Sequence, residues 1–235
     1  MNKTLIFTAT YNESKNISKL LNKIINLKEK VDLLIVDDNS PDGTSKIIKK
    51  FLNNNKNIFL KKRKGKLGLN TAHIYGYSYA LKNKYQKLIT MDADLSHEPK
   101  EIKKIIQLLD KHEFVIGSRY VKGGKNNMEG FRLLMSIAGN KIIKYTLNLN
   151  GTEFTSSYRG FNLKKLKKFN FKKIKSQGYS FFMETVFRLN NLGYESFEFP
   201  INFRQRDFGK SKIPKIEIFR TLYNIFKLYF KKKKV

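Results

Sequence analysis

The sequence predicts an α/β domain in which a mostly parallel sheet carries helices on both faces. Short apolar runs rich in strand formers alternate with segments whose apolar residues recur every three or four positions, and this alternation is typical of βαβ units. The length, 235 residues, favours one domain. Polar clusters follow three of the predicted strands, which places them at the carboxyl edge of the sheet, where ligands bind in such folds.

The expected elements succeed one another regularly through the first half of the chain. Predicted strands cover residues 4–8, 33–36, 58–60, 88–91 and 114–117, and helical spacing is seen over 17–25, 47–52, 71–81 and 102–109. An apolar helix with interrupting polar residues is expected over 131–149. Beyond it the pattern shows only turn and strand fragments until residue 218, and no internal repeat is present.

The C-terminal segment carries an apolar stripe opposed by basic residues. Residues 218–230 place apolar and aromatic side chains at steps of three and four, and the run Lys231–Lys234 follows. Such a helix suits a membrane interface; a terminal helix that packs on its own domain or across a dimer is the alternative. We therefore divide the chain into a domain at 1–212 and a basic amphipathic helix at 213–235.

Composition narrows the chemistry and the partners. Cysteine is absent, so disulfides and thiolate metal sites are excluded and a metal must be held by oxygen or imidazole. The net charge of +29 favours nucleic acid, an acidic lipid surface or phosphorylated substrates, although lysine is abundant throughout and much of it is solvated surface. No run of about 20 apolar residues and no signal-peptide layout is seen, so we expect a soluble or peripheral cytoplasmic protein.

Five carboxylates are expected at the ends of three strands: Glu13, Asp37, Asp38, Asp92 and Asp94. Gathered at one edge, they would repel one another unless a cation or hydrogen-bond donors satisfied them. Asp92 and Asp94 flank Ala93, and hard oxygen ligands of this kind suit Mg²⁺ or Mn²⁺ bridged to phosphate oxygens. Alone, the motif would be an ordinary solvent-facing turn. The three clusters together predict a metal and phosphate site.

These motifs, taken in order, resemble glycosyltransferase family 2 and, within it, the dolichol-phosphate (polyprenol-phosphate) mannose synthases. The resemblance covers about residues 4–212 and is specific as an ordered set. The segments that carry it are Tyr11-Asn12-Glu13, Val36-Asp37-Asp38-Asn39-Ser40-Pro41-Asp42-Gly43-Thr44, Met91-Asp92-Ala93-Asp94-Leu95, Gly117-Ser118-Arg119-Tyr120, Thr155-Ser156-Ser157-Tyr158-Arg159, and Phe203 through Arg206 and Gly209 to Ser211-Lys212.

The resemblance implies a GT-A (Rossmann-like) fold and an inverting transfer of mannose from GDP-mannose to a polyprenyl or dolichyl phosphate, with Mg²⁺ or Mn²⁺ as cofactor. The implied donor-binding residues are Ala9, Tyr11, Glu13, Val36, Asp38, Asp92, Ala93, Arg206 and Lys212. Asp94 would bind the metal, with Ser96 as a weaker ligand assisted by water or His97. The acceptor phosphate would meet Arg119, Arg132 and Ser136. The implied catalytic residues are Asp92, Asp94 and Arg119.

Departures from the family pattern fall at the second metal ligand, where Ser96 replaces glutamine, and near the acceptor side, at Glu153 and Ser157. A relative that uses UDP-glucose or UDP-N-acetylglucosamine, with a lipid-phosphate or glycan acceptor, is the alternative, and an inactive scaffold of the same fold stays open. A nucleic-acid-binding module explains the charge but not the five carboxylates, so we expect no nucleic acid. The expected partners are a nucleotide sugar, a polyprenyl phosphate and an anionic membrane surface.

Overall fold

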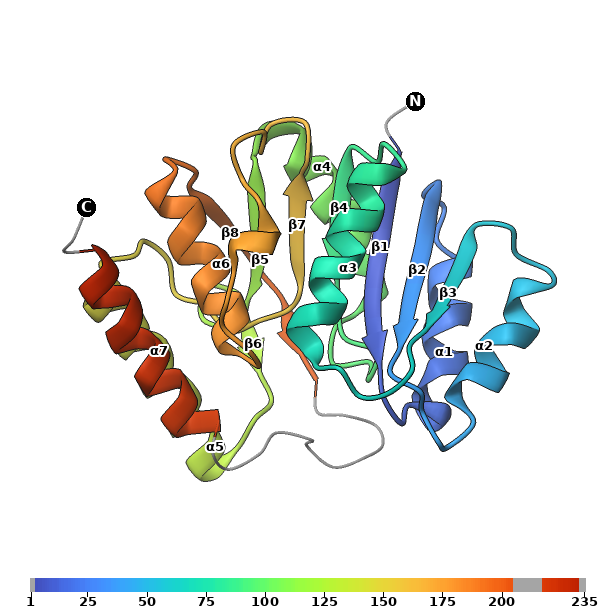
Figure 1. Cartoon of the computed structure of the whole chain (residues 1–235), viewed down its shortest axis with the longest axis horizontal. Helices are drawn as coiled ribbons and strands as arrows, with labels where there is room; N and C mark the ends of the chain where they lie inside the picture. Colours follow the sequence, from blue (N-terminus) through green and yellow to red (C-terminus); the bar gives the residue numbers. More distant parts are fainter. Residues whose placement is uncertain (1–2, 205–216, 233–235) are drawn as a thin grey trace.

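A seven-stranded sheet lies between two layers of helices in the computed structural model, which describes residues 3–204 and 217–232 (Figure 1). The strand order is β3-β2-β1-β4-β7-β5-β8; β7 runs antiparallel to both neighbours, and the remaining pairs are parallel. The predicted α/β fold is confirmed. The strands are β1 (Thr4–Thr10), β2 (Val31–Asp37), β3 (Ile58–Lys62), β4 (Lys87–Thr90), β5 (Phe114–Ser118), β7 (Arg159–Asn162) and β8 (Ser196–Pro200), and β6 (Lys125–Asn126) pairs with β9 (Asn202–Phe203) apart from them.

Helices cover both faces of the sheet. In Figure 1, α3 and α6 lie in front of it, whereas α5 and α7 stand together at the end nearest β8. The helices are α1 (Ser14–Ile25), α2 (Thr44–Leu52), α3 (Leu69–Lys82), α4 (Ile102–Lys111), α5 (Gly130–Leu147), α6 (Ser180–Asn191) and α7 (Glu217–Lys232), with short 3₁₀ turns η1 (Pro99–Glu101) and η2 (Phe171–Lys173).

Alternation along the strands divides the core into two layers, because successive side chains of a strand point to opposite faces. Ile6 of β1 packs in the layer built with α1, α2 and α4, whereas Leu5 and Phe7 pack in the layer built with α3, α5 and α6. A Cβ atom on Gly76 of α3 would lie 2.4 Å from the Phe7 ring. Glycine at that position therefore lets α3 approach β1 closely.

The second layer contains a buried histidine. His73 of α3 lies among the rings of Phe7, Phe181 and Phe182, at centroid distances of 4.9, 5.5 and 5.0 Å. Burial, assisted by the nearby positive charge of Arg159, lowers the pKa of His73 to about 3. His73 is thus a neutral component of the core at physiological pH.

The second half of the chain contains elements that sequence periodicity did not predict. Helix α6 buries nine of its residues, so it lacks the polar stripe that marks a surface helix. Strand β7 is only four residues long and begins with a buried arginine, Arg159. Both elements are buried along most of their length, and amphipathic patterns disappear in such segments.

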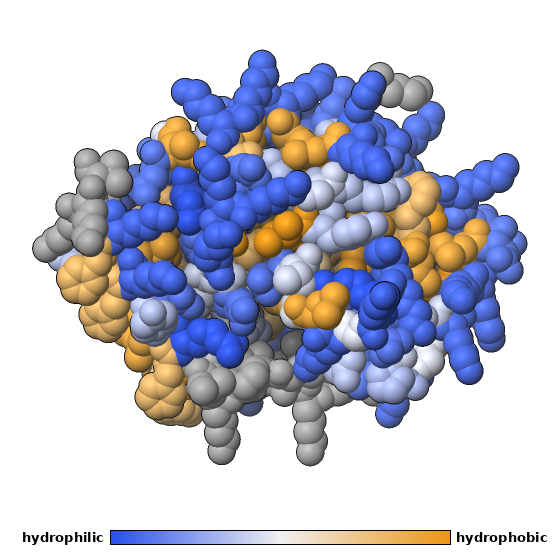
Figure 2. Space-filling view, in the orientation of Figure 1, coloured by the Kyte–Doolittle hydropathy of each residue, from blue (hydrophilic) through white to orange (hydrophobic). Residues whose placement is uncertain are grey.

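Helix α7 packs against α5 and α6 and buries Ile225 and Leu228. Its outer face leaves large apolar and aromatic side chains exposed, among them Phe219, Tyr223 and Phe226. Figure 2 shows apolar side chains along this edge of the molecule. Among the described residues, no helix has both the length and the apolar character required to cross a bilayer.

Candidate active site

The turns after β1, β2 and β4 lie side by side, because these three parallel strands are neighbours in the sheet. Each turn contains one non-glycine residue with a left-handed backbone: Asn12 at φ 56°, Asn39 at φ 57° and Leu95 at φ 64°. Asparagine adopts this conformation readily, but leucine does so at a cost of roughly 1–3 kcal/mol. The turn that contains Leu95 is therefore held in place by its surroundings.

Asp37 is satisfied by donors from the protein itself. Its Oδ1 atom accepts hydrogen bonds from Thr10 Oγ1 at 2.9 Å and Ser40 Oγ at 2.5 Å, and its Oδ2 atom accepts from Ser45 Oγ at 2.6 Å. The side chain is fully buried. Asp37 therefore ties β1 to the turn that precedes α2, and it needs no cation.

Asp38 pairs with an arginine that sequence reasoning missed. The Arg63 guanidinium, just after β3, donates to Asp38 Oδ1. It also donates to Thr71 Oγ1 at 2.6 Å and to the Gly68 carbonyl at 3.0 Å, at the start of α3. The sequence feature that could have identified Arg63 is the basic run at the end of β3, because β3 lies beside β2 and Asp38 directly follows β2.

The other predicted nucleoside-binding residues lie at the same edge. Ala9 of β1 is the register partner of Val36 of β2. The Lys66 ammonium lies 4.7 Å from the centre of the half-buried Tyr11 ring. Glu13 Oε2 accepts a hydrogen bond from the Asn16 amide at 2.8 Å. The structure thus gathers this set on one side of the edge, which we call the donor side after the role that the sequence predicts for these residues.

Asp92 and Asp94 follow β4, and each carboxylate accepts a hydrogen bond from a serine. Ser157 Oγ donates to Asp92 Oδ1 at 2.6 Å, and Ser96 Oγ donates to Asp94 Oδ1 at 2.6 Å. Asp94 is buried, whereas the Asp92 side chain is 38% exposed. Ala93 between them is buried in the core layer of α1 and α4.

His97 holds this turn through its ring. Its Nδ1 atom accepts a hydrogen bond from the Asp92 backbone N–H at 3.1 Å. The ring stacks on Tyr158 at 4.8 Å and meets the edge of Phe203 at 5.7 Å. Burial lowers the pKa of His97, against the opposing effect of Asp92 and Asp94, so the neutral imidazole can accept the backbone hydrogen bond.

The side chains at this turn fit a divalent cation that is shared with phosphate. Within residues 3–204 and 217–232, no group of three or more His, Asp or Glu side chains forms a complete metal site. Asp92, Asp94 and Ser96 are hard oxygen donors, which Mg²⁺ and Mn²⁺ prefer. A cation held by so few protein ligands would take its remaining oxygens from water and from phosphate.

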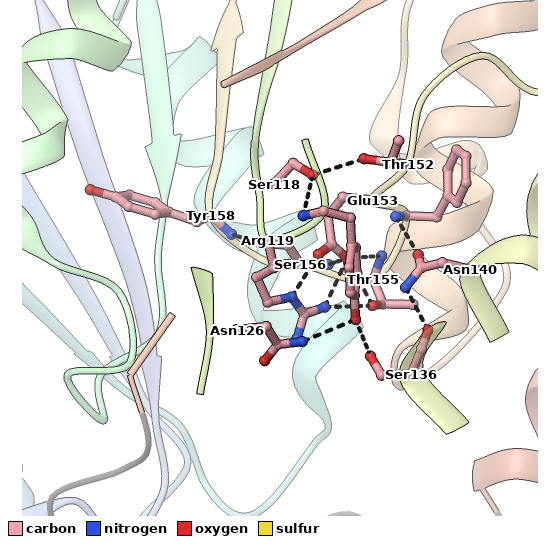
Figure 3. Close-up of polar contacts among 12 residues, drawn as sticks. Ser118, Arg119, Asn126, Ser136, Asn140, Thr152, Glu153, Thr155, Ser156 and Tyr158 are labelled. Atoms are coloured by element: carbon pink, nitrogen blue, oxygen red, sulfur yellow. Dashed lines mark hydrogen bonds and ion pairs between the residues drawn. The ribbon is translucent and has the colours of Figure 1, made fainter. Parts of the chain in front are cut away.

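On the other side of the edge, which we call the acceptor side after the role that the sequence predicts for its residues, Arg119 forms a buried ion pair with Glu153 (Figure 3). Its Nε atom donates to Glu153 Oε2 at 2.7 Å, and Nη2 donates to Glu153 Oε1 at 2.9 Å and to Thr155 Oγ1 at 3.2 Å. Burial alone would raise the pKa of Glu153, but Arg119 keeps it below its ordinary value. Both partners are therefore charged.

Ser136 reaches Arg119 through Tyr120. The Tyr120 hydroxyl lies 2.6 Å from Ser136 Oγ of α5, and the Tyr120 ring lies 5.2 Å from the Arg119 guanidinium carbon (Figure 3). Arg132, one turn earlier on α5, is exposed. The predicted acceptor residues thus come from two elements, and Tyr120 links two of them.

Arg206 and Lys212, the predicted diphosphate contacts, lie outside the described residues. The residues just before them are in contact with the turn after β4. The backbone N–H of Arg204 donates to the Ser96 carbonyl at 3.2 Å, and its guanidinium pairs with Glu98 at 3.2 Å. Phe203 lies between His97 and Arg119, with its ring 4.9 Å from the guanidinium carbon.

Comparison with known proteins identifies one family. Residues 5–169 match the model for glycosyl transferase family 2. The chain is 31% identical over 226 residues to a polyprenol monophosphomannose synthase from Mycolicibacterium smegmatis, covering 95% of this chain and 85% of that protein. It is 34% identical over 212 residues to an undecaprenyl-phosphate mannosyltransferase from Micrococcus luteus, covering 90% and 87%.

A solved structure shares the fold at much lower identity. The mannosyltransferase PcManGT from Pyrobaculum calidifontis, solved in complex with GDP-Man and Mn²⁺, superposes with a TM-score of 0.59 at 16% identity. The match covers 99% of this chain and 64% of that one.

Proposed function

Because the chain belongs to glycosyltransferase family 2, we propose that it transfers mannose from GDP-mannose to a polyprenyl phosphate at a membrane surface. The names of the two relatives support the sugar and the acceptor class. The observation that carries the proposal is the arrangement of charge at the sheet edge. Two carboxylates suited to a cation and a diphosphate, Asp92 and Asp94, share that edge with a buried arginine suited to a phosphate, Arg119.

On the donor side, the proposed contacts divide into nucleoside and diphosphate groups. The nucleoside would be held by Ala9, Tyr11, Glu13, Val36 and Asp38. Asp92 and Ala93 would lie close to the ribose and diphosphate, and Arg206 and Lys212 would contact the diphosphate. Asp94 and Ser96 would hold Mg²⁺ or Mn²⁺. When bound, this cation supplies charge neutralisation of the departing diphosphate.

On the acceptor side, the reaction needs orientation more than proton transfer. The acceptor phosphate is already an anion, so its oxygen can attack the anomeric carbon without a general base. A new C–O bond to phosphate forms, the C–O bond to the diphosphate breaks, and the nucleoside diphosphate leaves, with inversion at carbon. Arg119, Arg132 and Ser136 would fix the attacking phosphate, since the planar guanidinium matches phosphate oxygens.

The membrane contact is proposed on the outer surface of α5 and α7. Phe131, Leu134 and Tyr145 of α5 and Phe219 and Phe226 of α7 are exposed, and basic residues flank them. Exposed aromatic and apolar groups beside lysines suit an anionic lipid surface. Helix α5 also carries Arg132 and Ser136, so a bilayer in contact with this surface would present the lipid phosphate beside the acceptor residues. We propose that the protein binds the cytoplasmic face of the membrane.

The transfer reaction is tested with a short polyprenyl phosphate, GDP-mannose and Mn²⁺ or Mg²⁺, with UDP-glucose and UDP-N-acetylglucosamine as alternative donors. We expect mannosyl transfer that a chelator abolishes. Transfer only from a UDP sugar would keep the site and replace the donor. Absence of transfer from all three donors, in a protein shown to be folded, would contradict the proposal.

The membrane contact is tested by sedimentation with vesicles that contain phosphatidylglycerol. Because Phe219 and Phe226 are exposed, the double variant Phe219→Ser/Phe226→Ser should keep its thermal stability and lose about tenfold or more of its vesicle binding. The matched control is Leu81→Ser/Leu192→Ser, which removes exposed apolar side chains elsewhere. Equal binding by both double variants would reject this surface as the membrane contact.

A further inference from the structure

One loop, residues 152–157 between α5 and β7, reaches both sides of the site, and Figure 3 shows its contacts on the acceptor side. Its Glu153 carboxylate holds Arg119 on the acceptor side. Its Ser157 hydroxyl holds Asp92 on the donor side. We propose that Glu153 and Ser157 are positioning residues, which together fix the acceptor arginine relative to the donor carboxylate. The roles of Arg119 and Asp92 in this inference rest on the proposed function.

The start of the loop is fixed by a carboxylate from β8. Glu198 Oε1 accepts hydrogen bonds from the backbone N–H groups of Thr152 and Glu153, both at 2.7 Å, and Glu198 Oε2 accepts from Thr152 Oγ1 at 2.8 Å. A half-buried carboxylate that accepts three hydrogen bonds is costly to displace. The backbone position of Glu153 is therefore fixed, and with it the point from which its side chain extends toward Arg119.

The middle of the loop is fixed by a buried arginine. Arg159, 1% exposed, donates to the carbonyl oxygens of Ser156 at 2.6 Å and Phe154 at 2.8 Å, and to the Phe182 carbonyl of α6 at 2.8 Å. Asn140 Oδ1 of α5 accepts the Phe154 backbone N–H at 2.8 Å. Loop groups that would otherwise be orphaned are satisfied by three separate elements, so the loop has one stable arrangement.

The two side chains orient their partners as well as hold them. Glu153 occupies Nε and Nη2 of Arg119, and Nη1 makes no hydrogen bond within the part of the chain that the structure describes. The ion pair thereby selects which edge of the guanidinium faces a ligand. Ser157 occupies Oδ1 of Asp92, so rotation of that carboxylate is restricted while its side chain stays partly exposed.

A pair of substitutions separates the two roles. Ser157→Ala should weaken binding of Mn²⁺ with GDP, measured by calorimetry, about tenfold, the size expected for one hydrogen bond to a charged group. It should leave KM for a short polyprenyl phosphate within about twofold, since Arg119 is untouched. Glu153→Gln should do the reverse, raising KM for the lipid phosphate about tenfold at unchanged binding of Mn²⁺ with GDP.

Matched variants guard against a general loss of structure. Ser156→Ala is the control for Ser157→Ala, because the Ser156 hydroxyl accepts the Tyr158 backbone N–H at 3.2 Å and does not contact Asp92. Glu153→Asp keeps the charge, and a loss of acceptor affinity in it at unchanged melting temperature would support the assignment if Glu153→Gln fails to fold. The inference would be overturned if Ser157→Ala bound the nucleotide as tightly as Ser156→Ala does. It would also be overturned if a folded Glu153 variant had the same KM for the lipid phosphate as the unaltered protein.

Failure of the proposed function would look different. A wild-type chain that binds Mn²⁺ with GDP or UDP but transfers no sugar would contradict the proposed reaction. The comparison of Ser157→Ala with Ser156→Ala in nucleotide binding would still decide the role of Ser157.

Discussion

The donor side and the acceptor side of the site are both built from buried polar groups, but they are assembled over different distances along the chain. On the donor side, Asp37 bonds Ser40 and Ser45 and Asp94 bonds Ser96, all within eight residues, although Asp92 also bonds the distant Ser157. On the acceptor side, Arg119 bonds Glu153, 34 residues away. Several donor-side bonds are therefore made within one βα unit, whereas the Arg119 ion pair exists only when distant segments have met.

The largest expected effect is on the donor side. Asp94→Ala should lower the transfer rate by about a thousandfold or more, because it removes a carboxylate proposed to hold the cation that neutralises the leaving diphosphate. The bonds that Ser96 donates to it are local, so the melting temperature should change less than in a variant that breaks a distant buried ion pair. Transfer assays and thermal unfolding measure the two quantities. Full activity in this variant would contradict the proposed metal site at Asp94.

An acceptor-side change should behave in the opposite way. Arg119→Met leaves the buried Glu153 carboxylate without its partner, and breaking such a pair costs about 3–5 kcal/mol. Urea unfolding should therefore show a large loss of stability as well as a loss of transfer. A melting profile like that of Asp94→Ala would contradict the expected difference between Asp94, bonded locally, and Arg119, bonded to a distant segment.

The core layer beneath the two sides should make stability depend on pH. The pKa of His73 is about 3 in the folded chain against an ordinary 6.5, so the unfolded chain binds the extra proton first. Its contribution is complete above pH 6.5 and declines as pH falls toward 3, by about 1.4 kcal/mol per pH unit. Between pH 7 and 5 the loss is about 2 kcal/mol. Urea unfolding of His73→Phe at both pH values should show a smaller loss, and an equal loss would assign the pH dependence to other groups.

The smallest expected effect concerns an exposed acceptor residue. Arg132→Ala should raise KM for the polyprenyl phosphate about tenfold, which corresponds to one charge-assisted contact, with donor binding and stability unchanged because the side chain is exposed. Lys141→Ala on the same helix is the matched control, since it removes an exposed charge at a different position. If the variant lost affinity for the donor instead, Arg132 would have to be assigned to the donor side.

The same difference in distance explains what the sequence can predict. Carboxylates at strand ends follow from periodicity and turn signals, so Asp38, Asp92 and Asp94 are identified with their edge of the sheet. The pairing of Arg119 with Glu153 leaves no local pattern, because the partners meet only through β7 and its preceding loop. Arg63 was missed for the same reason: its carboxylate partner lies on the neighbouring strand.

The sequence also could not predict which of the strand-end carboxylates find hydrogen-bond or ion-pair partners within the protein. Five carboxylates at one edge suggest a strong need for a cation, yet Asp37 is satisfied by hydroxyl donors and Asp38 by Arg63. The need for a cation is thus concentrated on the pair after β4. Helix α6 and strand β7 were missed because burial on all sides removes the alternation that identifies an element.

The position of β7 has a consequence for how the molecule forms. Strands β4 and β5 do not pair with each other; β7 lies between them and pairs with both. During synthesis, β1 to β4 can associate as soon as they emerge, but β5 has no place in the sheet until Arg159–Asn162 has been made. Closing that long segment is an entropic cost that precedes its contacts. We expect the insertion of β7 to be a late folding step, so that nascent chains ending before it carry strand β5 with an unpaired edge.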